Sequence, residues 1–386
     1  MEKIGIMTSI ETNHGSCVFN TSLYNLIKSF NPENDVQLID IINSKSQFLE
    51  FLRSLKLHKK IPFYNFQRAL TLGRYNRSAT PIDLLNSLNG YENTCEELIS
   101  REYSTLIVAK VVWDISNNPK YKFPNAFWLS DKIHQKKIAY AVSGHRSDLE
   151  VFRKYKKKVL AILSSYQLIG VRDNMTQTMM EEAGVNKVTP VYRISDPAFF
   201  FEPIHIDPGS LLKRYKISPD RPLLALLYYG KDNISGNICE HYHRKGYQII
   251  NFNMYNPYAD INIGHLVSPD EWATLFKLLS FCITDRFHGS VFCLREGIPF
   301  VAIEPFPPRT LLNSKIYSVL QNFGIEELCY QNTYLPEFDP DRFIAVCDQL
   351  ESSWKSDLSG VIHSRLLVQN QNQRDFLELV KKQIET

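Results

Sequence analysis

The stretch FCITDRFHGS, residues 281–290, joins an apolar run to a polar turn, and a helix is predicted directly after it, over Val291–Glu296. A strand, a turn and a helix N-terminus in this order form an anion site, because free backbone N–H groups and the positive end of the helix dipole converge there. Arg286 can add a bidentate grip on a carboxylate or phosphate. His288 can donate or accept a proton near neutral pH. The alternative is a packed turn in which His288 caps a carbonyl and Arg286 pairs with Asp285.

The same alternation of apolar runs and helical segments extends through the chain. Strands are expected at residues 3–7, 36–42, 105–109, 137–142, 168–171, 223–229, 247–252, 281–284 and 300–303. Strands that alternate with helices predict parallel sheets covered on both faces. We therefore expect an α/β protein with two Rossmann-like domains facing each other across a cleft. The expected domains are residues 1–200, with a helical insertion at about 48–98, and residues 201–359, followed by C-terminal helices over 360–386.

Composition excludes several other classes of protein. An apolar fraction of 44% and a charged fraction of 22% are ordinary for a globular protein, so a disordered chain is not expected. A net charge of +3 is too small to indicate nucleic acid as the main partner, since duplex-binding proteins usually show a concentrated basic face. The seven cysteines form no CxxC pair, which favours a reducing cytoplasm. No run of 18 apolar residues is present, so we expect no membrane span, and a lipid-linked substrate would be met at the inner face of the membrane.

Three further segments place polar residues after predicted strands. Arg172 follows the strand at 168–171 and could face the cleft; the alternative is a helix cap by Asp173 with Arg172 on the surface. In the first turn, Asn13 and Gly15 could let the backbone approach a ligand, while His14 is either a contact or a solvent-facing residue. Trp113 and Asp114 could present a ring and a carboxylate to a sugar, or the ring could pack under a loop.

The sequence lacks the motifs of several other common enzyme classes. The chain has no phosphate-binding GxxxxGK loop, no GxSxG elbow, no HExxH helix and no GxGxxG fingerprint. His241 and His243 could share one face of a strand near Cys239 and Glu240, but without a second cluster we expect no metal site.

Taken together, these segments resemble the polysaccharide pyruvyl transferase family. The likeness covers nearly the whole chain, and its most specific block is ITDRFHGSVF at 283–292 with GIPF at 297–300. Weaker blocks are Asn13-His14-Gly15, the strand 103–109 with Trp113, and the segments 137–141, 169–173 and 195–197. Two positions depart from the family pattern: residues 109–112 read AKVV before the tryptophan, and Asp285, which could pair with Arg286, precedes the arginine.

The resemblance implies a two-domain architecture similar to GT-B glycosyltransferases. It also implies transfer of the enolpyruvyl unit of phosphoenolpyruvate to a sugar as a pyruvate ketal, with no cofactor. The implied phosphoenolpyruvate site comprises Arg172, Arg286, Phe287, His288, Gly289 and Ser290, with His288 and Arg286 catalytic. Asn13, Trp113 and Asp114 are the expected acceptor contacts, and the acceptor could be lipid-linked. A nucleotide-sugar glycosyltransferase and a non-catalytic glycan-binding protein remain as alternatives.

Overall fold

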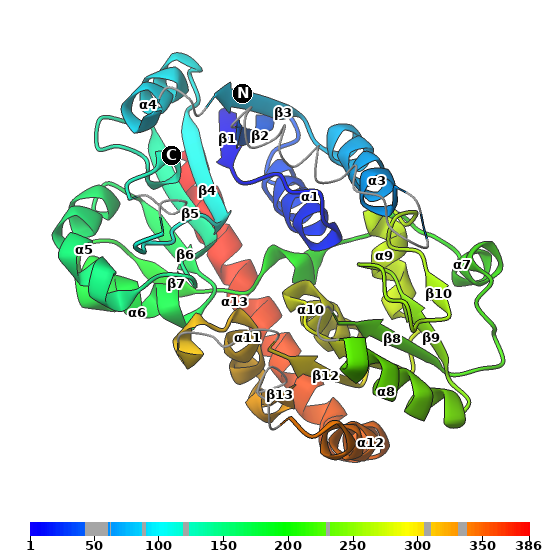
Figure 1. The fold of residues 1–386 in the computed structure, drawn as a ribbon. Coiled ribbons are helices and arrows are strands. Elements are labelled where there is room, and N and C mark those ends of the chain that lie inside the picture. The colour runs from blue at the N-terminus through cyan, green and yellow to red at the C-terminus, as the bar shows by residue number, and fades with distance from the viewer. Residues whose placement is uncertain are drawn as a thin grey trace.

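Two parallel sheets, each covered by helices on both faces, form the protein (Figure 1). The structure is a computed structural model that describes residues 1–42, 61, 63–86, 90–118, 123–228, 232–304, 310–330 and 338–386. Among these residues, none of the helices combines the length and the apolar character that a membrane crossing requires.

The first sheet has seven strands in the order β3-β2-β1-β4-β5-β6-β7. Its strands are β1 (Lys3–Met7), β2 (Asp35–Ile42), β3 (Ile82–Asn86), β4 (Thr105–Val111), β5 (Lys136–Ser143), β6 (Leu168–Val171) and β7 (Val191–Arg193). The helices of this lobe are α1 (His14–Lys28), α3 (Tyr64–Ala79), α4 (Gly90–Ser100), α5 (Leu149–Leu163) and α6 (Asn174–Ala183).

The second sheet has six strands in the order β10-β9-β8-β11-β12-β13. They are β8 (Leu223–Leu227), β9 (Gln248–Asn251), β10 (Ile261–Asn262), β11 (Phe281–Thr284), β12 (Phe300–Ile303) and β13 (Cys329–Tyr330). The helices are α7 (Pro208–Tyr215), α8 (Asp232–Arg244), α9 (Pro269–Phe276), α10 (Phe287–Glu296), α11 (Lys315–Phe323), α12 (Pro340–Asp357) and α13 (Ser359–Glu385). Short 3-10 turns lie at Ala126–Trp128, Val185–Lys187, Pro197–Phe200, Leu311–Asn313 and Glu326–Leu328.

Helix α13 packs against both lobes. It runs from the second lobe back to the first, along the red ribbon that crosses the centre of Figure 1. Ile362, near its start, belongs to the core of the second lobe, whereas Phe376 and Val380 belong to the core of the first. Burying apolar side chains in both cores fixes the orientation of one sheet relative to the other.

The central strands confirm the expected pattern of continuous apolar runs. Every residue of β8 and β11 is buried, as parallel strands covered on both faces require. A capping box precedes α9: the Ser268 hydroxyl accepts from the backbone N–H of Glu271, and the Glu271 carboxylate accepts from the backbone N–H of Ser268.

Two expectations about the elements were wrong. The segment expected as a helical insertion, residues 48–98, includes strand β3, which pairs with β2. Its residues 48–60, 62 and 87–89 lie outside the described part of the chain. As an edge strand, β3 has Leu85 fully buried but Leu84 exposed, so its apolar pattern is weak. Helix α10 begins four residues earlier than expected, because Arg286 already has the extended backbone of an N-cap.

Candidate active site

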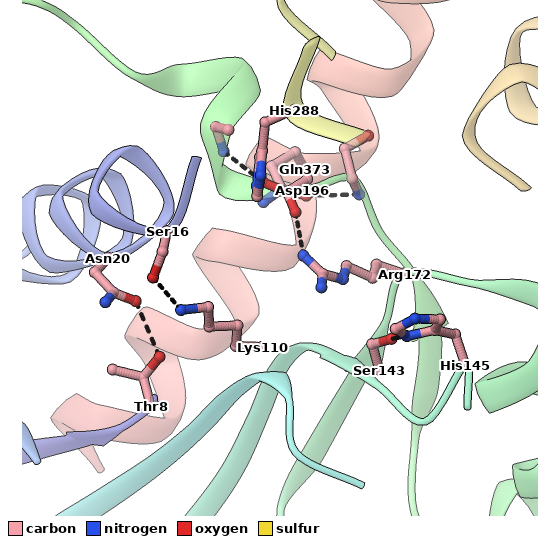
Figure 2. Close-up of polar contacts among 12 residues, drawn as sticks. Thr8, Ser16, Asn20, Lys110, Ser143, His145, Arg172, Asp196, His288 and Gln373 are labelled. Carbon is pink, nitrogen blue, oxygen red and sulfur yellow. Dashed lines mark hydrogen bonds and ion pairs between the residues drawn. The ribbon is translucent and has the colours of Figure 1, made fainter. Parts of the chain in front are cut away.

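The carboxyl ends of both sets of strands meet where the two lobes join. Arg172 follows β6, Asp196 follows β7, and His288 lies in the first turn of α10, directly after β11 (Figure 2). This is the edge at which open parallel sheets bind ligands. The structure thus brings Arg172 together with the block at 284–290, as the sequence predicted, and adds Asp196 between them.

Asp196 is the link between the lobes. Its carboxylate accepts a hydrogen bond from Arg172 Nη1 and another, 2.9 Å long, from the backbone N–H of Ala198. The side chains of Arg172 and Asp196 are only 4% and 1% exposed. Burial alone would raise the pKa of Asp196, but Arg172 and His288 outweigh it and hold that pKa at about 2. The carboxylate therefore stays ionised at any physiological pH.

His288 faces Asp196 from the other lobe. Its Nε2 lies 3.6 Å from Asp196 Oδ1, an ion-pair distance that is longer than a hydrogen bond. On another side the ring packs against Gly15 in α1, where a Cβ atom would collide with it. Burial, with Arg172 and Lys315 nearby, lowers the pKa of His288 although Asp196 opposes the shift. The imidazole is therefore neutral near pH 7 and ready to take up a proton when an anion arrives.

Two cations lie close to the ring of Phe287. The guanidinium carbon of Arg172 lies 5.2 Å from the ring centroid, and Nζ of Lys315, from α11, lies 5.4 Å from it. The His288 ring also touches it, with centroids 5.1 Å apart. Phe287 is thus a buried platform that holds two cations and an imidazole close together.

The N-terminus of α10 is open in the way an anion site requires. Arg286 is the N-cap residue and gives the helix no side-chain cap. Gly289 lies so close to the Thr284 hydroxyl that a Cβ atom could not fit, and buried Ser290 lies behind it. However, Arg286 Nε and Asp285 Oδ1 form an ion pair 2.8 Å apart, which is the pairing that the sequence left open. The grip of Arg286 on a ligand anion is reduced accordingly.

The turn between β1 and α1 lies close to the site and also caps α1 and contacts the other lobe. Asn13 caps α1 by accepting from Ser16 N at 2.8 Å, and its amide donates to Glu11 at 2.8 Å. His14 is buried, stacks on Trp272 and bonds the carbonyl of Val267, so it joins the lobes and does not face solvent. The turn also receives Lys110, whose ammonium donates to the carbonyl of Ser9 and to the hydroxyl of Ser16.

The expected stacking of Trp113 on a sugar is wrong. Its ring is fully buried, stacks on Trp128 with centroids 4.9 Å apart, and donates from Nε1 to the carbonyl of Phe127. Asp114 lies nearer the lobe junction: it accepts from the backbone N–H of Arg146 at 2.9 Å, and burial raises its pKa to about 6. The ring fills the core, while the carboxylate orders the loop after β5.

The two histidines considered for metal binding lie on helix α8, not on a strand. His241 bonds Asp348, and His243 bonds Asp260. Helical residues two apart point in different directions, so the two imidazoles do not converge. Within the described ranges, no group of three or more His, Cys, Asp or Glu side chains could hold a metal ion.

Two groups at the junction, Lys315 and His145, were not predicted from the sequence. Lys315 lies at the start of α11, after a segment with no recognisable motif. His145 follows β5, with its Nδ1 3.2 Å from the Ser143 hydroxyl, and burial, with Lys315 and Arg146 nearby, lowers its pKa well below the usual range. The rule that polar residues after predicted strands gather at one edge could have indicated His145, but nothing in the sequence indicated Lys315.

Comparisons with known proteins agree on the fold. A glycosyltransferase from Rickettsia africae matches with a TM-score of 0.53, 10% identity, and coverage of 100% of this chain and 99% of that one. A ugt transferase from Siraitia grosvenorii in complex with UDP has a TM-score of 0.57 and 7% identity, with 100% of both chains covered. The N-terminal domain of a Candida albicans trehalose-6-phosphate phosphatase has a TM-score of 0.52 and 11% identity, with 98% and 96% covered. At these identities the likeness concerns the fold alone.

Sequence comparison identifies the family. No curated protein matches the chain. The family model described as "Polysaccharide pyruvyl transferase" matches residues 23–305, which is most of the chain and includes Arg172, Asp196 and His288. The chain therefore belongs to the polysaccharide pyruvyl transferase family and has a GT-B-like fold.

Proposed function

We propose that the protein transfers the enolpyruvyl group of phosphoenolpyruvate to a saccharide, where it forms a pyruvate ketal. The acceptor would be a unit of a surface or capsular polysaccharide or of its lipid-linked precursor. One observation carries the proposal beyond family membership: Asp196 joins Arg172 of one lobe to His288 of the other, beside the uncapped N-terminus of α10. An anion grip and a proton-transfer group thus lie side by side.

The chemistry requires one proton transfer to carbon. A proton adds to the methylene carbon of phosphoenolpyruvate and leaves an oxocarbenium-like centre at C2. One sugar hydroxyl attacks C2, and a second displaces the phosphate, whose oxygen keeps the electrons of the broken C–O bond. Of the two protons that the hydroxyls release, one replaces the proton delivered to the methyl carbon and the other leaves with phosphate.

His288 is the residue we assign to the proton transfer. It is neutral in the free protein, and an incoming carboxylate and phosphate would raise its pKa, so that it carries a proton when the donor is bound. Asp196 would hold that imidazolium in place. The N–H groups of the first turn of α10 would stabilise the leaving phosphate.

On the acceptor side, two turns follow central strands of the first sheet. Asn13 and Asp114 lie on turns that follow β1 and β4, and both already have hydrogen-bond partners. We propose that these two turns line the sugar subsite, with Asp114, whose pKa of about 6 suits proton acceptance, facing the hydroxyls.

Acceptor-dependent release of phosphate tests the proposal. Purified protein is incubated with phosphoenolpyruvate and a panel of saccharides, and phosphate and ketal are both measured. Wild-type protein should release phosphate only with a suitable acceptor, and His288→Gln should be slower by about 10²–10⁴-fold. Binding of UDP, with no binding of phosphoenolpyruvate, would instead support the nucleotide-sugar alternative.

A further inference from the structure

Both arginines expected to hold the donor are already paired in the structure. Arg172 donates a hydrogen bond to the buried carboxylate of Asp196, and Arg286 forms an ion pair with Asp285. Because Asp196 stays ionised, the charge of Arg172 is largely neutralised before a ligand arrives. Arg172 retains hydrogen-bonding capacity, since its buried Nε has no partner within the described residues. A residue whose cation contacts no carboxylate would therefore add to the attraction for a multiply charged donor.

Lys315 is that residue. It is partly buried at the first position of α11, with its Nζ over the Phe287 ring. None of the ion pairs or hydrogen bonds among the described residues involves its ammonium, although the carboxylates of Glu11 and Asp196 act on its charge from farther away. Burial, together with Arg172 and Arg146, lowers the pKa of Lys315 to about 8, so the amine is still mostly protonated at pH 7. A partly desolvated ammonium that contacts no carboxylate favours a bound anion.

The start of α11 is held firmly, so Lys315 is not a loose surface lysine. Ser314 caps the helix by accepting from Tyr317 N at 3.0 Å, and its hydroxyl donates to Glu304. The preceding residue, Asn313, donates from Nδ2 to the carbonyls of His145 at 2.6 Å and Ser147 at 3.0 Å. These bonds fasten the turn to the other lobe, beside the loop that carries Arg146.

We propose that Lys315 binds the phosphate group of the donor and stabilises it as it leaves. The proposal rests on the proposed function for the identity of the donor. An ammonium is a compact point charge suited to phosphate, whereas the planar Nε and Nη edge of Arg172 suits a carboxylate. Phe287, the first residue of α10, touches both cations, so the phosphate would also meet the open N-terminus of that helix. As the C–O bond breaks, its electrons move to the phosphate oxygen beside the ammonium.

The test uses full-length Lys315→Met and Lys315→Arg proteins, with Lys154→Met as the matched control. Lys154 is an exposed lysine on α5. Thermal unfolding is followed at pH 7 with and without inorganic phosphate. We expect phosphate to stabilise the wild type and Lys154→Met, and Lys315→Met to lose that shift while its melting temperature without phosphate does not fall. Lys315→Arg should recover much of the shift, because it restores the charge.

Steady-state kinetics separate this proposal from the proposed function. With phosphoenolpyruvate and an acceptor, Lys315→Met should raise KM for phosphoenolpyruvate and lower kcat/KM by about 10²-fold, with partial rescue in Lys315→Arg. Normal kcat/KM in Lys315→Met, or an unchanged phosphate shift, would overturn the role of Lys315 and leave the proposed function intact. A phosphate shift that depends on Lys315 in a wild-type protein that does not turn over phosphoenolpyruvate would support the anion site and contradict the proposed function.

Discussion

The imidazole of His288 packs directly against Gly15, so that a side chain of any kind at residue 15 would displace the ring. The two residues come from different lobes and lie on the first turns of α10 and α1. The glycine is thus a steric requirement of the site, since it lets the imidazole reach Asp196.

Gly15→Ala should therefore damage function more than stability. Alanine is a better helix former than glycine by about 1 kcal/mol, which offsets part of the cost of moving the ring. We expect kcat/KM to fall by about 10²-fold, as for loss of a positioned acid or base, with a change of only a few degrees in Tm. Gly73→Ala in α3 is the matched control, because a Cβ atom there meets nothing within 4 Å. Equal activity of the two variants would show that the contact is not needed.

Asp196→Asn should be strongly destabilising. It leaves the buried guanidinium of Arg172 without a counterion, which costs about 3–5 kcal/mol. The folded-state pKa of Asp196, about 2, is below the ordinary value of 3.8. Its contribution to stability is therefore present above about pH 4 and is lost as the pH falls towards 2. Urea unfolding should show a large difference in the free energy of unfolding between wild type and variant at pH 7, and this difference should narrow below pH 4. A difference that does not change with pH would rule out the ionised Asp196 carboxylate as its cause.

Binding of phosphoenolpyruvate should be accompanied by proton uptake. The pKa of His288 is lowered in the free protein by burial and by Arg172 and Lys315, against the opposing effect of Asp196. A bound anion raises that pKa, so the ring gains a proton near pH 7. Calorimetry in two buffers of different ionisation enthalpy measures the uptake. His288→Gln corrects for protons exchanged by the ligand itself, and identical uptake in that variant would assign the proton to another group.

Trp113→Phe should affect the core and not the acceptor. The substitution removes the 3.0 Å hydrogen bond to the carbonyl of Phe127 and part of the stacking on Trp128. We expect a loss of about 1–3 kcal/mol in the free energy of unfolding. The KM for the saccharide should stay the same. A raised KM for the saccharide at unchanged stability would restore the ring as a sugar contact.

Much of the fold could be predicted because the central strands are buried on both faces. Strand β11 has the predicted bounds, and Arg172 and His288 follow their strands, so the edge of the sheets on which they lie could be inferred from local pattern alone. Edge strand β3 was missed because half of its apolar pattern faces solvent. The pattern of apolar residues along the sequence therefore predicts a strand reliably only where the strand is buried on both faces.

The partners of the site residues could not be predicted in the same way. Two of these contacts depend on the relative orientation of the lobes, which α13 and the first turn help to fix: His288 against Gly15, and Lys315 above Phe287. Trp113 was assigned to the wrong surroundings because residue type does not distinguish a ring that fills a core from one that faces a sugar. Asp285 was the exception, since a neighbour in sequence could be recognised as a partner for Arg286.

A crystal structure of the protein with phosphoenolpyruvate tests the central claim most directly. We predict that the ligand lies at the junction of the lobes, with its phosphate at Lys315 and the N-terminus of α10, its carboxylate at Arg172, and its methylene carbon facing His288. Phosphoenolpyruvate bound away from these residues, with a nucleotide occupying the junction in its place, would contradict the proposed function.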